Sequence, residues 1–217
     1  MKKSKHILVT NDDGYESVAL HALVDELRKI ARVTVVAPAN EKSACGHSLT
    51  LSHPLNFVSV DDDFYKLDDG TPSDCIYLAL HSMFEDDRPD LVVSGINKGS
   101  NMGEDITYSG TAAGAMEAVL QGVPAIAVSQ VLDFSQPLPS FELAAKTTGA
   151  LVAKILDEDF PIPEREFLNI NVTHSIDEAA LKVTYAGYRC YGNDAHLHRN
   201  PRGMEYYLLG LHPLDFR

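Results

Sequence analysis

Four short apolar runs constrain the fold of this chain more than any other feature of its sequence. Each run is continuously apolar instead of alternating with polar residues, which is typical of strands whose sheet is covered on both faces. The runs are residues 6–10, 33–38, 91–95 and 124–130. Between the first two, apolar side chains recur at spacings of three and four over residues 18–31, which predicts an amphipathic helix.

Three further helices are predicted from the sequence. One begins at residues 71–74, Thr-Pro-Ser-Asp, where the Thr is a good N-cap, the Pro suits the first helical position and the Asp lies in the first turn. An Asp at that position only approximates the usual capping box, which has Glu or Gln there. The other two helices are expected at about residues 110–121 and 141–156. Strands and helices in alternation predict an α/β fold with a mostly parallel sheet.

The regular pattern fades after residues 169–172, Asn-Ile-Asn-Val. Residues 186–204 carry Gly, Asn, Pro, His and Arg with little periodicity, and residues 206–209 predict a short strand. A length of 217 residues fits one domain with an appendage. We therefore expect residues 1–175 to form the core and residues 176–217 to form an extended arm or hairpin, which serves oligomerisation and is not an independent domain.

The charge of the chain argues against some classes of partner. Lys and Arg number 18 and Asp and Glu number 31, so the net charge is −13 with histidine neutral. A surface this acidic repels phosphate backbones, and we expect no nucleic-acid partner, although a small phosphorylated ligand held by a metal is compatible with it. No apolar stretch approaches the roughly 20 residues that span a bilayer, so no membrane partner is expected.

The cysteines and the first residues indicate the compartment. The three cysteines are scattered and include no CxxC pair, which fits neither a disulfide framework nor a structural zinc site. The first apolar run is too short for the hydrophobic region of a secretory signal. We therefore expect a protein of the reducing cytoplasm.

Polar clusters follow the predicted strands, where ligands bind in open parallel sheets. The first cluster, residues 11–14, is Asn-Asp-Asp-Gly. Adjacent carboxylates such as Asp12 and Asp13 both stay ionised when a cation offsets their charge, but a solvated turn would suit the same residues. A second cluster, residues 38–48, contains Ser43 and by itself fits a polar surface loop better.

A third cluster, residues 94–103, combines three glycines with Asn97 and Asn101. Such a loop after a buried strand favours close backbone approach to a ligand, and it matches neither a P-loop nor the dinucleotide fingerprint. Ser109 then precedes a helix of small residues, where it is either an ordinary N-cap or part of an anion site. Asp, Ser and Asn side chains supply hard oxygen ligands, which suit Mg²⁺ or Mn²⁺ and not zinc.

At these residues the sequence resembles the SurE family, the stationary-phase survival proteins that act as 5′/3′-nucleotidases. The resemblance spans nearly the whole chain, and its long central motif is highly specific. The matching stretches are ILVTNDDGYES (7–17), VAPANEKSACGHSLT (36–50), GTPSDC (70–75), PDLVVSGINKGSNMGEDITYSGTAAGAMEA (89–118) and the weaker PRGMEYYLLG (201–210).

The resemblance implies a divalent-metal-dependent phosphomonoesterase that hydrolyses nucleoside 5′- and 3′-monophosphates, and short polyphosphate in some members. It implies one Mg²⁺ or Mn²⁺ per subunit, a Rossmann-like core with helices on both faces of the sheet, and a homodimer or homotetramer built through extended C-terminal elements. Family members run on beyond a YYLLG-like segment, whereas this sequence stops at Arg217. That departure bears on the oligomeric state more than on the metal site.

The residue roles that the resemblance implies are carried over position by position. The implied metal ligands are Asp12, Asp13, Ser43 and Asn97. The residues implied around the phosphate are Asn97, Asn101, Ser109, Gly110 and Thr111, and those implied in catalysis are Asp12, Asp13 and Asn101.

The residues leave the chemistry of the attack open between two routes, a metal-activated water and an aspartyl phosphate on Asp12 or Asp13. Three neighbouring residues each have a functional and a plainer interpretation. His47 is either a catalytic acid or an exposed loop histidine, and Lys98 either offsets phosphate charge or is a solvated lysine. Tyr108 either stacks on a nucleobase or is a packed aromatic. A nucleotide-binding module without turnover and a nucleotide-sugar transferase are the rival functions. The intact candidate ligands favour the hydrolase.

Overall fold

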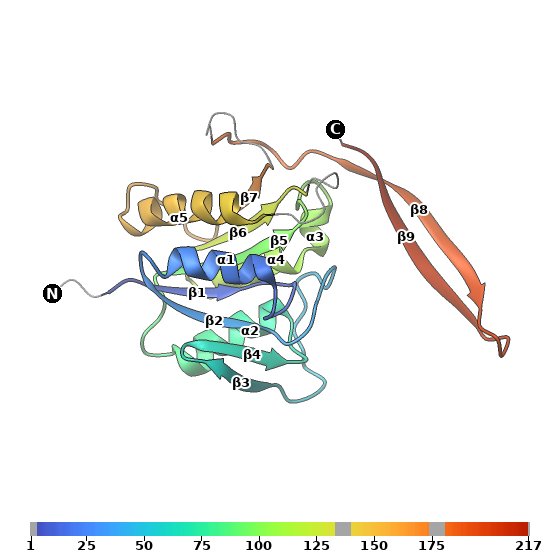
Figure 1. Ribbon diagram of the computed structural model, residues 1–217, viewed down its shortest axis with the longest axis horizontal. Helices are drawn as coiled ribbons and strands as arrows, with labels where there is room; N and C mark the ends of the chain where they lie inside the picture. Colours follow the sequence, from blue (N-terminus) through green and yellow to red (C-terminus); the bar gives the residue numbers. More distant parts are fainter. Residues whose placement is uncertain (1–3, 133–139, 174–180, 217) are drawn as a thin grey trace. The chain divides into compact units, whose positions relative to one another are not determined.

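The computed structural model describes residues 4–132, 140–173 and 181–216 of the chain. The backbone forms two compact units (Figure 1). The larger comprises Met1–Asn101 and Ile106–Ala179, and the smaller comprises Met102–Asp105 and Ala180–Arg217.

The larger unit is built on a seven-stranded sheet with the strand order β3-β4-β2-β1-β5-β6-β7. Every neighbouring pair is parallel except β3 and β4 at one edge, which are antiparallel. The predicted parallel sheet is therefore confirmed. The strands are β1 (His6–Thr10), β2 (Arg32–Pro38), β3 (Asn56–Asp61), β4 (Phe64–Asp68), β5 (Leu91–Lys98), β6 (Ala125–Gln130) and β7 (Phe167–Val172).

The strand order places a topological switch point between β1 and β5. From β1 the chain first builds outward through β2, and it then returns to add β5 on the other side of β1. In open α/β sheets the connections diverge at such a point, which leaves a crevice at the carboxyl ends of the two strands. The polar cluster at residues 11–14 follows β1, and the cluster at residues 94–103 begins within β5 and continues into the loop after it.

Helices cover both faces of the sheet, as predicted (Figure 1). Ile7 and Val9 pack with α1 and α5 in one buried cluster, whereas Leu8 faces the other way and packs with α2 and α4. This alternation follows from the period of two along a strand. The helices are α1 (Val18–Leu27), α2 (Pro72–Leu78) with its π-helical extension η1 (Ala79–Met83), α3 (Asp105–Tyr108), α4 (Gly110–Leu120) and α5 (Glu142–Leu156).

The small residues of α4 let this helix approach the sheet closely. A Cβ added at Gly114 would lie 2.9 Å from Ser94 Oγ and 3.0 Å from Thr10 Cγ2, so any larger residue would push the helix away from β1 and β5. The close approach brings the first turn of α4 to the carboxyl end of β1.

Some local features differ from the sequence expectation. The first helix ends at Leu27 instead of Ala31, because the segment after it turns before β2. The β3–β4 hairpin was not predicted, since β3 is mostly exposed and lacks an apolar run. The sequence predicted only an approximate capping box at the start of α2. The structure has a full one: the side chains of Thr71 and Asp74 each accept a hydrogen bond from the other's backbone N–H.

The smaller unit contains an antiparallel hairpin of β8 (Arg189–Arg199) and β9 (Glu205–Phe216), which confirms the expected C-terminal hairpin. β9 is longer than the short strand expected at residues 206–209, and β8 was not predicted as a strand because it carries mostly polar residues and shows no apolar run. Within this unit Asp105 accepts contacts from Arg189 and Tyr191. Several large apolar side chains are exposed, namely Leu181, Val183, Tyr185, Tyr188, Leu197, Met204, Tyr206, Tyr207, Leu208 and Leu209.

Among the residues that the structure describes, no helix is long and apolar enough to cross a membrane.

Candidate functional site

The loops after β1 and β2 and the start of α4 meet at the carboxyl end of β1. Lys42 N donates to Asp12 O at 2.7 Å, so the loop after β2 lies directly against the Asn-Asp-Asp-Gly turn. Gly46 N donates to Tyr108 O at 2.9 Å, which ties the same loop to the residues just before α4. Main-chain bonds therefore hold three of the predicted site segments together.

Asp12 is buried at the centre of this junction, with 4% of its surface exposed. Its two carboxylate oxygens accept from one residue: Thr111 N donates to Oδ2 at 2.9 Å and Thr111 Oγ1 to Oδ1 at 2.5 Å. Burial raises the pKa of Asp12 to about 6; the Thr111 hydroxyl opposes this rise and the charge of Asp13 adds to it. The first turn of α4, where the helix dipole favours an anion, thus faces a carboxylate of the protein itself.

Gly110 makes this approach possible because it has no side chain. A Cβ at this position would lie 2.8 Å from Asp12 Cβ and 2.9 Å from Cys45 Sγ. No pattern in the sequence indicates that Cys45 lies beside Asp12. Burial, followed by the charge of Asp12, raises the pKa of the Cys45 thiol to about 11, so the thiol stays protonated.

Asp13 lies beside Lys98, the last residue of β5. Lys98 N donates to Asp13 Oδ2 at 3.3 Å, and Lys98 Nζ lies 3.8 Å from Asp13 Oδ1. Burial raises the pKa of Asp13, Lys98 opposes this rise, and the charge of Glu41 adds to it. The lysine therefore offsets carboxylate charge at the switch point.

The two neutral candidate ligands make local bonds. Ser43 is exposed, and its Oγ donates to Glu41 Oε1 at 2.8 Å. Asn97 Nδ2 donates to Gly99 O at 2.9 Å, so the amide nitrogen is used within the loop and the side-chain oxygen keeps its acceptor capacity.

Ser109 caps α4, as the plainer of the two interpretations expected. Ala112 N donates to Ser109 Oγ at 3.0 Å, and Ala113 N donates to Ser109 O at 3.1 Å. Since Thr111 N donates to Asp12, these three N–H groups of the first turn already have partners. The phosphate role expected for Ser109, Gly110 and Thr111 stays a prediction.

Asn101 is 6% exposed and lies against strands β6 and β7. Its Nδ2 donates to Ser129 Oγ at 2.9 Å, and its main-chain N–H donates to Asn171 Oδ1 at 2.8 Å. Its carbonyl oxygen accepts from Asn169 Nδ2 at 2.9 Å and from Asn171 Nδ2 at 3.1 Å. The sequence analysis missed both β7 asparagines; their spacing of two in the alternating stretch Asn-Ile-Asn-Val is the signal that could have found them.

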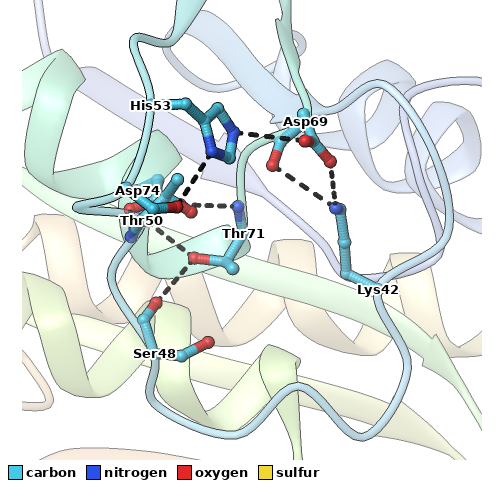
Figure 2. A network of polar contacts seen from close by, with 8 residues as sticks. Lys42, Ser48, Thr50, His53, Asp69, Thr71 and Asp74 are labelled. Carbon is cyan, nitrogen blue, oxygen red and sulfur yellow. Dashed lines mark hydrogen bonds and ion pairs between the residues drawn. The ribbon is translucent and has the colours of Figure 1, made fainter.

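A polar network fixes the loop that carries Ser43 (Figure 2). Lys42 Nζ donates to Asp69 Oδ1 at 2.9 Å, and His53 Nε2 lies 3.1 Å from Asp69 Oδ2. Deeper in the network, Asp74 accepts from Thr50 N at 2.8 Å and from Thr50 Oγ1 at 2.7 Å. The loop after β2 is therefore tied at both ends to the turn between β4 and α2.

His47 contacts helix α4. Its Nε2 lies 2.7 Å from Oε2 of Glu117, a buried residue of α4. Glu117 Oε1 also accepts from Gln121 Nε2 at 2.8 Å. The imidazole is therefore a further tie between this loop and α4.

The donor set fits a hard divalent cation. Two adjacent carboxylates with raised pKa values lie where a positive charge would stabilise both of them. Within the described ranges no group of three or more His, Cys, Asp or Glu side chains could hold a metal. The other two expected ligands, Ser43 and Asn97, offer neutral oxygens. Carboxylate, amide and hydroxyl oxygens are typical of Mg²⁺ or Mn²⁺ sites, whereas zinc sites use nitrogen and sulfur.

Comparison with known proteins assigns the chain to a family. The family model of the survival protein SurE matches residues 7–193. The chain belongs to the SurE family. One SurE relative, the 5′-nucleotidase SurE of Sulfurimonas denitrificans, is 64% identical over 97% of this chain and 82% of its own length. Another, the 5′-nucleotidase SurE of Helicobacter hepaticus, is 58% identical over 98% of this chain and 82% of its own length.

A solved SurE structure agrees with this assignment. The crystal structure of the SurE protein from Aquifex aeolicus matches this chain with a TM-score of 0.81 and 42% identity, over 95% of this chain and 82% of that chain. The resemblance that the sequence motifs carried is therefore confirmed, together with the α/β fold that it implied.

Proposed function

We propose that this SurE protein hydrolyses nucleoside 5′-monophosphates to nucleoside and phosphate, with 3′-monophosphates and short polyphosphate as further substrates. The observation that carries the proposal is the buried Asp12 carboxylate beside Asp13 at the switch point between β1 and β5. The names of the relatives, 5′-nucleotidase SurE, support the same activity.

One Mg²⁺ or Mn²⁺ per subunit would be held by two carboxylates and two neutral oxygens. When bound, the ion would neutralise charge that builds on the transferring phosphoryl group. The proposed ligands are Asp12, Asp13, Ser43 and Asn97. The residues proposed around the phosphate are Asn97, Asn101, Ser109, Gly110 and Thr111, and those proposed in catalysis are Asp12, Asp13 and Asn101.

The hydrogen bonds of Asp12 favour water as the attacking group. Both oxygens of its carboxylate accept from Thr111, and an oxygen that is already hydrogen-bonded is a weaker nucleophile. Asp12 is therefore better suited to hold charge than to form a phosphoenzyme. Lys98, which faces Asp13, adds a positive charge close to the place where the phosphate would lie.

The acidic surface and the exposed apolar hairpin support the remaining expectations. We propose a core of residues 1–175 and an arm of residues 176–217, through which copies of the chain form a homodimer or homotetramer. An isolated two-stranded hairpin is only marginally stable in water, and exposed apolar patches mark interaction sites. Leu209 and Tyr207, at 80% and 65% exposed, are examples of such side chains. We also propose that the enzyme is cytoplasmic and has no nucleic-acid or membrane partners.

The test is phosphate release from a panel of nucleoside 5′- and 3′-monophosphates, each measured with Mn²⁺, with Mg²⁺ and with EDTA. Asp12→Asn is the site variant, and Asp25→Asn on the exposed side of α1 is its matched control. We expect release that needs the metal, is lost in Asp12→Asn and is kept in Asp25→Asn. Release that survives EDTA and Asp12→Asn contradicts the metal site, and folded protein that binds nucleotide without release favours the binding module.

A further inference from the structure

Two asparagines of β7 hold the main chain of a loop that comes from a different strand. Asn169 and Asn171 are two residues apart, so their side chains lie on the same face of β7. Both donate to the carbonyl oxygen of Asn101, and Asn171 also accepts from the N–H of the same residue. We call Asn169 and Asn171 the asparagine pair.

The hydrogen bonds of the asparagine pair fix the position of Asn101. Asn is depleted in strands and contributes little to an apolar core, so these two side chains contribute chiefly through polar contacts. Their partner Asn101 is buried, and its own amide donates to Ser129 Oγ on the neighbouring strand β6. Buried amide bonds of this kind fix direction as well as distance, because an unpaired donor or acceptor there costs about 1–3 kcal/mol.

The held loop carries candidate site residues. Asn97 and Lys98 pair with β6 at the end of β5, and Gly99 N donates to Gln130 O at 3.0 Å. The segment 97–101 is thus bound to β6 at its start and to β7 at its end. Asn97 is a proposed metal ligand and Lys98 faces Asp13, so the segment that the asparagine pair holds at Asn101 is continuous with two residues of the proposed site.

We propose that Asn169 and Asn171 are positioning residues, which set the site loop 97–101 through the main chain of Asn101. The proposal rests on the nucleotidase function for its kinetic consequence, whereas the holding of the loop does not depend on it. Neither side chain is a proposed metal ligand or phosphate contact, and both bind the main chain of Asn101. Both act at a distance by fixing where Asn97 and Lys98 lie.

The experiment compares four variants of the full chain. Asn171→Leu removes one acceptor and one donor from Asn101, and Asn169→Leu removes one donor. Asn171→Asp keeps the acceptor for Asn101 N–H and loses the donor, so it serves if the leucine variant fails to fold. Ile170→Val, between them on β7 and packed on the core, is the matched control.

Three quantities are measured on each variant: hydrogen–deuterium exchange of peptides that cover residues 97–101, Mn²⁺ affinity without substrate, and kcat with KM for nucleotide hydrolysis. We expect faster exchange in this segment in Asn171→Leu, with smaller effects in Asn171→Asp and Asn169→Leu. Mn²⁺ affinity should fall about 10-fold and kcat about 10- to 100-fold in Asn171→Leu, because outer residues that orient ligands have effects of this size. Ile170→Val should match the wild type in all three.

A merely structural role gives a different result. It predicts a lower unfolding midpoint, with unchanged exchange in residues 97–101, unchanged Mn²⁺ affinity and unchanged kcat per folded molecule; that result overturns the proposal. If the wild type releases no phosphate, the nucleotidase function fails, and exchange together with Mn²⁺ affinity then decides on the asparagine pair alone. Faster exchange with weaker Mn²⁺ binding supports it, and unchanged values refute it.

Discussion

Thr111 donates to both carboxylate oxygens of Asp12, through its main-chain N–H to one and its hydroxyl to the other. The two residues lie far apart in the sequence, one after β1 and one in the first turn of α4. The contact joins the end of β1 to the start of α4. Among the described residues, Thr111 donates most of the hydrogen bonds that the buried carboxylate accepts.

Thr111→Val removes the hydroxyl and keeps the shape and the N–H. We expect the free energy of unfolding to fall by about 1–3 kcal/mol, because a buried carboxylate loses a charge-assisted hydrogen bond. Urea denaturation measures the change. Thr148→Val is the control: Thr148 is equally buried, but its hydroxyl donates to a neutral carbonyl, that of Ala144, so its loss should be smaller. An equal fall in the free energy of unfolding in both variants would show that the bond to the Asp12 carboxylate stabilises the protein no more than a bond to a neutral carbonyl.

Gly110→Ala tests the close approach of α4 to Asp12. A Cβ at this position would overlap Asp12 Cβ and Cys45 Sγ, so Asp12 would have to move. Displacement of a proposed ligand by about 1 Å can lower the rate about 100-fold, and we expect nucleotide hydrolysis to fall on this scale. Gly149→Ala is the helical control, since the atoms nearest to its Cβ would belong to the flexible side chain of Glu26. An active Gly110→Ala enzyme would contradict the tight fit.

Asp74→Ala tests the network that holds the loop after β2. Asp74 is buried and accepts from Thr50 N, Thr50 Oγ1 and Thr71 N, so its loss leaves several donors unpaired. We expect the free energy of unfolding to fall by about 1–3 kcal/mol and proteolysis of residues 42–53 to become faster. Asp69→Asn, which removes an exposed ion pair of the same network, should cost less and should lose its effect at high salt. If Asp69→Asn lowered the free energy of unfolding more than Asp74→Ala, the exposed ion pairs of Asp69 would be what holds the loop.

His6 makes the stability of the protein depend on pH. Burial lowers the pKa of His6 from its ordinary value of 6.5, Arg32 lowers it further, and Asp63, Asp87 and Asp90 oppose this. Below pH 6.5 the unfolded chain binds a proton that the folded protein does not yet bind. The stabilisation is therefore complete above pH 6.5 and is lost as the pH falls from there to the lowered pKa of the folded state.

The comparison of wild type with His6→Gln isolates this group from the other titrating residues. Denaturation between about pH 7.5 and pH 5.5 should show the stability advantage of the wild type shrinking as the pH falls. His6 Nε2 lies 3.0 Å from Thr34 Oγ1, and this contact stabilises the folded protein while the imidazole is neutral, as it is at every pH above 6.5. An advantage that stays constant with pH would show that His6 does not titrate differently in the two states.

Leu209→Lys and Tyr207→Lys test the proposed role of the hairpin in assembly. Both side chains are exposed in the chain, and a charge at either position opposes burial against another copy. We expect sedimentation velocity to show a smaller species than the wild type. Leu120→Lys, at an exposed position of α4, should leave the species unchanged. Wild type and variants of equal, monomeric mass would remove the arm from the assembly proposal.

The sequence predicted the strands and helices that have buried, periodic apolar residues. It also located the switch-point loops, because polar residues after buried strands mark the carboxyl edge of a parallel sheet. The β3–β4 hairpin was missed because β3 is mostly exposed and β4 is short, with only two buried residues. Contacts such as those of Thr111 with Asp12 and of Asn171 with Asn101 join residues about 99 and 70 positions apart, and no local pattern encodes such pairings.

The position of Asp12 directly after β1 has a consequence for how the protein is handled. β1 is the central strand, it is buried along its whole length, and it is paired on both sides. A partly unfolded molecule that has lost β1 therefore has no site. Any cation bound there stabilises only the native state, by about 2.7 kcal/mol at one hundred times its dissociation constant. If the proposed metal site is loaded, the catalytic rate per mole of chain measures the fraction of native molecules, and added cation raises that fraction.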